Sequence, residues 1–356
     1  MTTVALLGLG TTTAAFADDP APDTTGAFQT TPTAYTVPGY TKLDPEKATP
    51  AEVSAAVDAV AQSASHSLFS VNFMWTLIAG FLVMFMQAGF AMVETGLIRA
   101  KNAAHTISMN FMVYALGMFG FFVCGFALMC GGLNGTAIGG PVTLGGTPTL
   151  HSMFTIGSAV NGDHGWGLFG TTGFFLSGNG YDAAAIVLFL FMMVFMDTTA
   201  TIVTGACAER WSFKSFFLFS ILIGGLIYPI FGCWVWGGGW LAQLGYRSGL
   251  GHGAVDYAGS GVVHLQGGAL AFITALLIGP RIGKYGKDGK INPILPHHIP
   301  MVQIGTFILA FGWFGFNAGS SLAGGDGRIG IVAVNTMIAG MAATMTGVIY
   351  MWNVVG

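Results

Sequence analysis

The chain has 356 residues, of which 53% are hydrophobic and 8% are charged, and its formal net charge is −3. Soluble proteins carry about 25% charged residues, so this composition, with a mean hydropathy of +0.69, excludes an ordinary soluble domain and indicates an integral membrane protein. The small negative charge gives no reason to expect a nucleic-acid partner.

The first 17 residues resemble a secretory signal peptide. An apolar run ends in the small-residue stretch AFA at 15–17, and acidic residues follow it, as at a signal cleavage site. The basic residues that normally open such a segment are absent. Residues 18–67 are predicted to form an exported linker that ends in a short helix, with Thr49 as N-cap, Pro50 as first residue and Glu52 completing a capping box.

Seven stretches are long and apolar enough to cross a membrane as helices of about 20 residues. They cover residues 68–97, 105–131, 181–207, 213–237, 256–280, 299–322 and 329–355. If the first begins outside the cell, the loops after the first, third and fifth spans are cytoplasmic, and they hold eight of the twelve Lys and Arg residues. Loops rich in Lys and Arg stay inside. The chain is therefore predicted to be a multi-pass protein of the cytoplasmic (inner) membrane, with its N-terminus outside.

Two ionisable residues lie in the fifth span. Asp256 stands at its outer end, where it is predicted to accept hydrogen bonds from the first amides of the helix. His264 follows eight residues later, about 12 Å deeper. Ionisable groups inside a membrane are costly and mark functional positions, but a histidine among glycines is as often a packing residue. The residues alone leave both alternatives open.

Aromatic residues recur in the neighbouring spans. Phe191 and Phe195 lie four residues apart on one face of the third span, Trp236 ends the fourth, and the sixth holds Phe316 and Ser320 in the stretch GWFGFNAGS. Each alone is more typical of core packing or of an interfacial aromatic belt. Together with a nearby carboxylate, the π-faces and the hydroxyl favour a site that attracts a small cation.

Five stretches resemble signatures of the ammonium transporter, methylammonium permease and Rhesus protein family. In chain order they are GFAMVETGLIRAKN, TGACAERWSF, WGGGWLA, DYAGSGVVHLQGG followed by LLIGPR, and GWFGFNAGS. The resemblance covers residues 68–356 and implies an all-α polytopic membrane fold, the ammonium transporter fold, with eleven helices in two inverted five-helix repeats plus a last helix. It also implies a homotrimer. About seven helices are present here, so we expect an incomplete membrane domain whose second repeat stops after its second helix.

The resemblance also implies roles for individual residues at the outer site. Trp236, Phe195 and Ser320 correspond to the family's external ammonium site. Asp256 corresponds to the acid that supports this site without touching the ion.

The same resemblance extends to the pore below that site. Phe195 and Phe316 match the stacked pair that closes the pore, with Phe191 beside them. His264 matches the first of two facing pore histidines, and the second is expected beyond the chain end.

The substrates that the resemblance implies are ammonium and methylammonium, carried through the lipid bilayer without a cofactor or metal. A bare cation is costly in an apolar pore, so ammonium is expected to bind at the mouth, lose a proton and cross as ammonia. A cytoplasmic nitrogen-regulatory signalling protein is a further expected partner. The alternative function is an ammonium sensor that joins the same membrane fold to a cytoplasmic signalling extension. An enzyme is disfavoured, because no nucleophile, metal cluster or cofactor motif accompanies Asp256 and His264.

Three further acids are placed by their positions in the spans. Asp197, two residues beyond Phe195, is predicted to be a buried acid bonded to neighbouring helices. Glu94 and Glu209 lie at cytoplasmic helix ends and are predicted to pair with Arg99 or Arg210.

Overall fold

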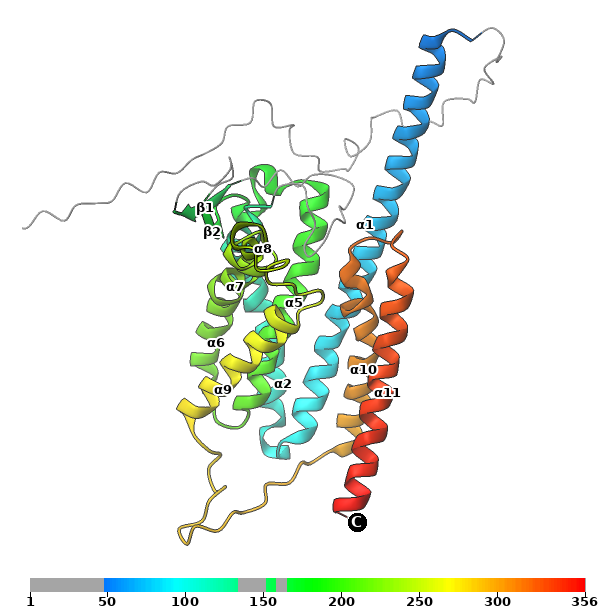
Figure 1. The fold of residues 1–356 in the computed structure, drawn as a ribbon. Coiled ribbons are helices and arrows are strands. Elements are labelled where there is room, and N and C mark those ends of the chain that lie inside the picture. Colours follow the sequence, from blue (N-terminus) through cyan, green and yellow to red (C-terminus); the bar gives the residue numbers. More distant parts are fainter. Residues whose placement is uncertain (1–47, 134–151, 158–164, 356) are drawn as a thin grey trace, which may run out of the picture.

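The computed structural model describes residues 48–133, 152–157 and 165–355, which form mainly helices (Figure 1). Seven helical segments of this part are long and apolar enough to cross a membrane: Pro50–Leu97, Ala100–Cys130, Ala183–Cys207, Phe213–Ser248, Ser260–Ile278, Ile299–Ser321 and Arg328–Val354. Each matches one predicted span, so the all-α polytopic fold is confirmed. The predicted signal peptide and most of the predicted linker lie outside the described residues.

The first span is one continuous helix, α1, of 48 residues from Pro50 to Leu97. The predicted capping box starts it: the Glu52 N–H donates to the Thr49 hydroxyl at 3.3 Å, and the Thr49 N–H donates to the Glu52 carboxylate at 2.8 Å. The short helix expected before residue 68 does not end there. No Gly or Pro interrupts residues 53–67, so the helix continues into the span and reaches about 72 Å at 1.5 Å per residue.

Helix α10 (Ile299–Phe316) packs antiparallel along α1 (Figure 1). The His298 N–H, just before α10, donates to the Gly96 carbonyl near the end of α1. Glycines let the two backbones approach: a Cβ on Gly89 would lie 2.9 Å from the Gly305 carbonyl oxygen. Small residues at such contacts are typical of membrane helices. The contact fixes the 3₁₀ turn Ala318–Ser321, which follows α10, against the middle of α1.

The second, fourth and fifth spans contain π-helical turns, which close with i→i+5 hydrogen bonds. These turns are Val113–Gly117, Phe121–Gly125, Ile223–Ile227 and Ser260–Leu265. The α-helical parts around them are α2 (Ala103–Met112), α3 (Met118–Gly120), α4 (Phe126–Cys130), α6 (Phe213–Leu222), α7 (Tyr228–Val235) and α9 (Gln266–Ile278). A 3₁₀ turn, Ala100–Asn102, precedes α2.

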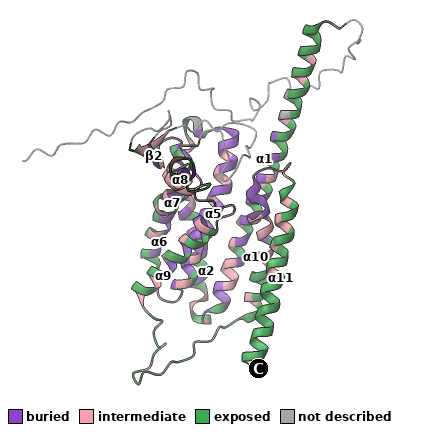
Figure 2. Cartoon of the chain, in the orientation of Figure 1, coloured by how far each residue is buried: buried purple, intermediate pink, exposed green. Residues whose placement is uncertain are grey.

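Helix α5 (Ala183–Cys207) is the core of the described bundle, whereas α11 (Arg328–Val354) lies at its surface (Figure 2). In their most apolar stretches, 72% of the α5 residues are buried and none of the α11 residues are. Helix α5 begins at Asp182, whose carboxylate accepts from the Ala184 N–H at 2.9 Å, and it packs against α1, α2 and α9. Residues on α5 can therefore meet side chains from most other spans.

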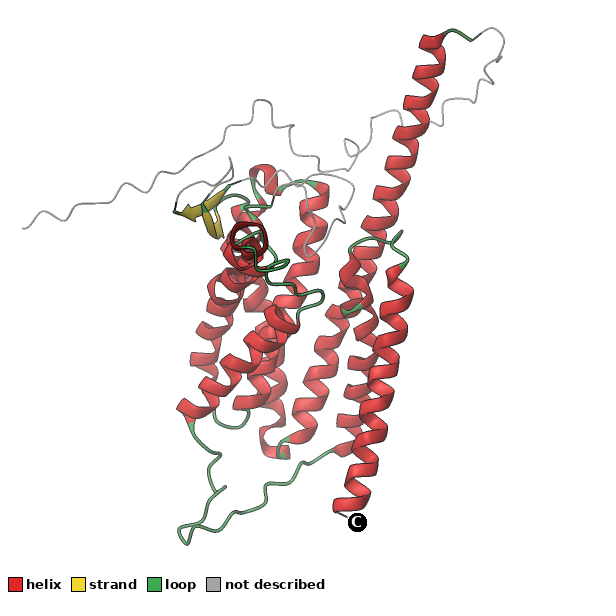
Figure 3. Ribbon diagram, viewed as in Figure 1, coloured by secondary structure: helices red, strands yellow, loops and turns green. Residues whose placement is uncertain are grey.

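Two short strands and one helix cover one end of the bundle (Figure 3). Strand β1 (Met153–Ile156) pairs antiparallel with β2 (Trp166–Gly170), and the Gln243 side chain of α8 (Trp240–Ser248) accepts from the Gly167 N–H of β2 at 3.1 Å. The 3₁₀ turns Phe174–Leu176 and Gly178–Gly180 lead into α5. We call this the strand end, and the opposite end, where Arg99 and Arg210 lie, the arginine end.

Candidate functional site

Aromatic rings from three spans meet near the strand end and form what we call the aromatic site. The Phe195 ring of α5 stacks on Phe316 of α10 with ring centroids 4.1 Å apart, and it meets the edge of Trp236, which follows α7, at 6.0 Å. Phe191, one turn earlier on α5, lies 4.5 Å from Phe195. Each of these four rings is at most 4% exposed. The structure thus brings together every aromatic residue that the sequence assigned to the site.

Ser320 is held close to the aromatic site as a hydrogen-bond acceptor. It lies in the turn after α10, is 8% exposed, and donates its hydroxyl hydrogen to the Phe316 carbonyl oxygen at 2.6 Å. A hydroxyl has one hydrogen and two lone pairs. Because the hydrogen is already used, the lone pairs are what the hydroxyl can offer to a ligand.

Asp256 is bound by the backbone of the loop and turn that follow it. Its Oδ1 accepts from the Gly259 N–H at 2.7 Å, and its Oδ2 accepts from the N–H groups of Gly261 and Val262 at 2.8 and 2.7 Å. The wrap requires glycine at 259, where φ is +98° and a Cβ would lie 2.7 Å from Val263. Asp256 therefore caps the fifth span as predicted.

A second contact joins Asp256 to the aromatic site. The Trp236 indole N–H donates to the Asp256 backbone carbonyl oxygen at 2.6 Å. Among the ion pairs of the described residues, none includes the Asp256 carboxylate. Asp256 thus orients the indole through its backbone, and its carboxyl group is paired with no Lys or Arg side chain among the described residues.

His264 lies beside Phe316, at a ring-centroid distance of 5.5 Å. It belongs to the π-helical turn Ser260–Leu265, and the residue is exposed in the part of the chain that the structure describes. The structure therefore places the His264 ring next to the stacked phenylalanines, and the ring nitrogens can donate or accept a hydrogen bond.

Asp197 lies two residues beyond Phe195 on α5, deep inside the bundle. It is 2% exposed, and its Oδ1 has no hydrogen-bond partner among the described residues. The predicted burial is confirmed, but for this oxygen atom the predicted bonds to neighbouring helices are not formed.

Glu209 joins three loops at the arginine end. Its carboxylate accepts from Arg99 Nε at 3.0 Å, from Asn102 Nδ2 at 2.9 Å and from Arg281 Nη1 at 3.2 Å. Burial alone would raise the pKa of Glu209, but the hydrogen bonds from Arg99 and Asn102 and the Arg99 charge outweigh it and lower the pKa from 4.5 to about 2. The predicted pairing with Arg99 is confirmed, whereas Arg281 had no predicted role.

For Glu94 the predicted arginine partner is wrong. Its carboxyl group is bonded to the neutral side chains of Asn110 and Thr204, each at 2.7 Å. Arg210, the other expected partner, donates to the carbonyl oxygens of Ala206 and Gly279. Helical periodicity alone cannot show this arrangement, because α1, α2 and α5 all contribute to it.

Known sequences that match this chain cover most of its length. A model of the Ammonium Transporter Family matches residues 74–356. The chain is 45% identical over 285 residues to a protein named Ammonium transporter Amt2 from Archaeoglobus fulgidus, which covers 79% of this chain and 54% of the relative. It is 35% identical to Ammonium transporter Amt1 from Haloferax mediterranei, over 77% of this chain and 50% of the relative. The chain thus spans about half the length of the curated relatives that it matches.

Solved structures share the arrangement of helices. A structure described as Sensor Amt Protein aligns with a TM-score of 0.65 and 34% identity, over 81% of this chain and 63% of that chain. Mep2 from Candida albicans aligns with a TM-score of 0.58 and 26% identity, over 76% of this chain and 52% of that chain.

Proposed function

Because the chain belongs to the ammonium transporter family, we propose that it carries ammonium or ammonia across the cytoplasmic membrane, with ammonium recruited at the aromatic site. The observation that carries this proposal is the close assembly of Phe195, Phe316 and Trp236 beside the Ser320 hydroxyl. Ammonium and methylammonium are cations with directed N–H donors. Aromatic faces stabilise the charge, and the serine oxygen accepts an N–H.

The next step in the proposed pathway is transfer of a proton from ammonium to water at the strand end, which leaves ammonia at the aromatic site. Within the aromatic site, the stacked rings of Phe195 and Phe316 are at most 1% exposed and present no group that could replace the hydration shell of a cation. The neutral molecule passes such a stack at lower cost. His264 then stands beside Phe316, 5.5 Å away, and offers a hydrogen bond to the ammonia that emerges.

Uptake of labelled methylammonium by cells that express the protein tests the recruitment step. A desolvated cation–π contact is worth up to about 2 kcal/mol, so Trp236→Leu should raise the half-saturation concentration by about tenfold. Trp352→Leu, the same change at a residue that is 72% exposed on α11, is the matched control and should leave uptake unchanged. A lower maximal rate without a change in half-saturation would place recruitment elsewhere.

The proposed orientation puts the strand end outside the cell and the arginine end in the cytoplasm, because the arginine end carries the basic loops. A cysteine at Ser177, near the start of α5, should then react with an impermeant thiol reagent added to intact cells. A cysteine at Lys287 should react only after the membrane is opened. The reverse pattern would invert the orientation, and cross-linking in the same membranes would test the proposed homotrimer.

An ammonium sensor is the second candidate, and the similarity to the structure described as Sensor Amt Protein favours it. A sensor needs the aromatic site for binding but no flux through the Phe195–Phe316 stack. Binding of methylammonium to purified protein that is sensitive to Trp236→Leu, without uptake into liposomes, would favour the sensor. Uptake into liposomes would favour the transporter, and a cytoplasmic nitrogen-regulatory protein remains a proposed partner of either.

A further inference from the structure

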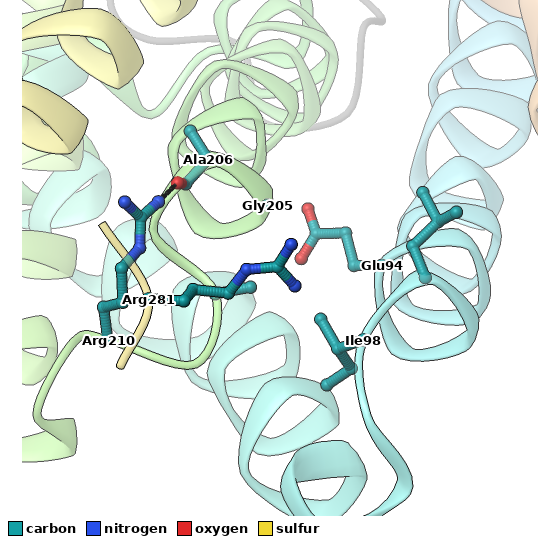
Figure 4. Close-up of a pocket in the computed structure, with 8 residues that line it drawn as sticks. Glu94, Ile98, Gly205, Ala206, Arg210 and Arg281 are labelled. Carbon is teal, nitrogen blue, oxygen red and sulfur yellow. Dashed lines mark hydrogen bonds between the residues drawn. The ribbon is translucent and has the colours of Figure 1, made fainter. Parts of the chain in front are cut away.

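One buried carboxyl group has no part in the pathway proposed above. Glu94 of α1 is 8% exposed and lines a pocket of about 330 Å³ at the arginine end, together with Gly205, Ala206, Arg210 and Arg281. Figure 4 shows the Glu94 carboxyl group and the Arg281 guanidinium pointing into this pocket from opposite sides. An ionisable group at such a position in a membrane protein is costly and calls for a function.

The oxygen–oxygen distances around Thr204 constrain the protonation state of Glu94. The Thr204 hydroxyl oxygen lies 2.7 Å from both carboxyl oxygens of Glu94 and 2.6 Å from the Thr201 carbonyl oxygen. All three are hydrogen-bond distances, but a hydroxyl has one hydrogen and the carbonyl can only accept. With an ionised Glu94, three acceptor oxygens would share that hydrogen. A proton on Glu94 supplies the second one: the carboxyl group donates to Thr204, which donates to the Thr201 carbonyl.

The remaining hydrogen bonds continue this arrangement into a ring across α1, α2 and α5. The Glu94 oxygen Oε2 accepts from Asn110 Nδ2 at 2.7 Å, and the Asn110 backbone carbonyl oxygen accepts from Gln87 Nε2 at 3.0 Å. The Gln87 oxygen Oε1 accepts from the Thr201 hydroxyl at 2.9 Å, one turn before Thr204. Every donor in the ring then has its own acceptor once Glu94 carries a proton.

Apart from Asp197 and Lys101, the charged neighbours of Glu94 are engaged with other groups. The titratable and charged residues on the elements packed around it include Asp197 and Cys207 on α5, His105 on α2, His297 and His298 before α10, and Arg99, Lys101, Glu209, Arg210 and Arg281 in the loops and turns. Arg281 and Arg99 bind Glu209, and Arg210 binds backbone carbonyls. The His105 ring packs on Phe213, and the His297 and His298 rings bond to the backbone of Ile98 and Met301.

We propose that Glu94 is a proton-binding site that exchanges its proton with water in this pocket. In the bound state the carboxylic acid donates to Thr204 and accepts from Asn110. In the empty state the proton has passed to a water molecule, and the carboxylate that remains faces the Arg281 guanidinium across the pocket (Figure 4). The site lies on the α1 side of α5, whereas the aromatic site lies where α5 meets α7 and α10, so it is separate from the recruitment of ammonium.

Infrared difference spectroscopy of the purified protein in lipid bilayers tests this proposal without an uptake assay. At neutral pH the protein should show the carbonyl stretch of a protonated carboxylic acid. Glu94→Gln should remove that band, whereas Asp197→Asn, which changes a buried acid on α5, should leave it. Because the pocket is open, the band should shift when the bilayers are moved into D₂O. A band that does not respond to D₂O would show a sealed acid and overturn the proposal.

Substitution of the hydroxyl partner gives an independent result if Glu94→Gln fails to fold. Thr204→Val keeps the branched shape but removes the hydroxyl, so the frequency of the same band should change. Thr199→Val, the same change on the face of α5 turned toward α9, should leave the frequency unaltered. The assignment would be overturned if the band persisted in Glu94→Gln, or if its frequency were unchanged in Thr204→Val.

Discussion

The strand end and the arginine end of the bundle each hold a buried acid, but with different partners. At the strand end, Asp256 accepts from three backbone N–H groups, and none of the ion pairs of the described residues includes it. At the arginine end, Glu209 is surrounded by the side chains of Arg99 and Arg281. Amide N–H groups are neutral, so a carboxylate that they bind still attracts cations at a distance. A carboxylate paired with guanidinium groups is compensated by their positive charge, so its attraction for distant cations is weak. The first suits attraction of a cation, and the second suits attachment of loops.

The largest effect is expected for Asp256→Asn, which removes the carboxylate at the strand end. The amide nitrogen cannot accept from Gly261 and Val262, so two hydrogen bonds to a charged group, worth about 1.5–3 kcal/mol each, are lost. Because the same residue holds the Trp236 indole, half-saturation for methylammonium uptake should rise about a hundredfold or more. An unchanged half-saturation would mean that Asp256 acts only as a helix cap.

A smaller effect, on stability, is expected for Glu209→Gln at the arginine end. Because the pKa of Glu209 is lowered from 4.5 to about 2, ionised Glu209 stabilises the folded state fully above about pH 4.5, and this contribution disappears as the pH falls toward 2. The contribution is about 1–3 kcal/mol after allowance for solvent screening. Thermal unfolding in detergent should show a lower midpoint for the variant at pH 7, with the difference shrinking below pH 4.5.

The control for that measurement is an exposed ion pair at the same end. Asp288 and Lys290 lie 3.3 Å apart, and their side chains are 56% and 83% exposed. Exposed pairs contribute little to stability, so Asp288→Asn should leave the midpoint almost unchanged. If both variants lowered the unfolding midpoint equally, burial of Glu209 would add nothing to the stability of its ion pairs. The proposed role of Glu209 in attaching the loops would then be wrong.

The smallest effect is expected for Ser320→Ala, which sharpens the description of the strand end. The variant loses one acceptor for an N–H of the charged substrate, and a hydrogen bond to a charged group contributes about 1.5 kcal/mol at the lower end of its range. Half-saturation for ammonium should therefore rise about tenfold. Methylammonium has one fewer N–H to satisfy, so its uptake should suffer less. Competition between the two ions measures this difference, and an equal loss for both would contradict the assigned hydroxyl contact.

The sequence predicts what depends on local pattern and fails where distant segments meet. The seven spans follow from apolar runs of sufficient length, and the capping box at Thr49 and the helix cap at Asp256 follow from the residues next to them. The aromatic site follows from the family resemblance. The partners of Glu94 do not, because Asn110 and Thr204 lie 16 and 110 residues away. The length of α1 does not follow from hydropathy, because the polar residues before the apolar run are helical as well.

The π-helical turn at Ser260–Leu265 also fixes the order in which side chains appear around its helix. A helix of 3.6 residues per turn advances about 100° per residue, and a π-helical turn accommodates one residue more than an α-helical turn. Upstream of that extra residue the Asp256 loop is anchored, and downstream α9 is packed against α5. The direction in which His264 points from the helix axis is thus set by the extra residue and not by a choice of rotamer. With one residue fewer between the two anchors, the position after Val263 would be rotated by about 100° around the helix axis, and no imidazole would face Phe316.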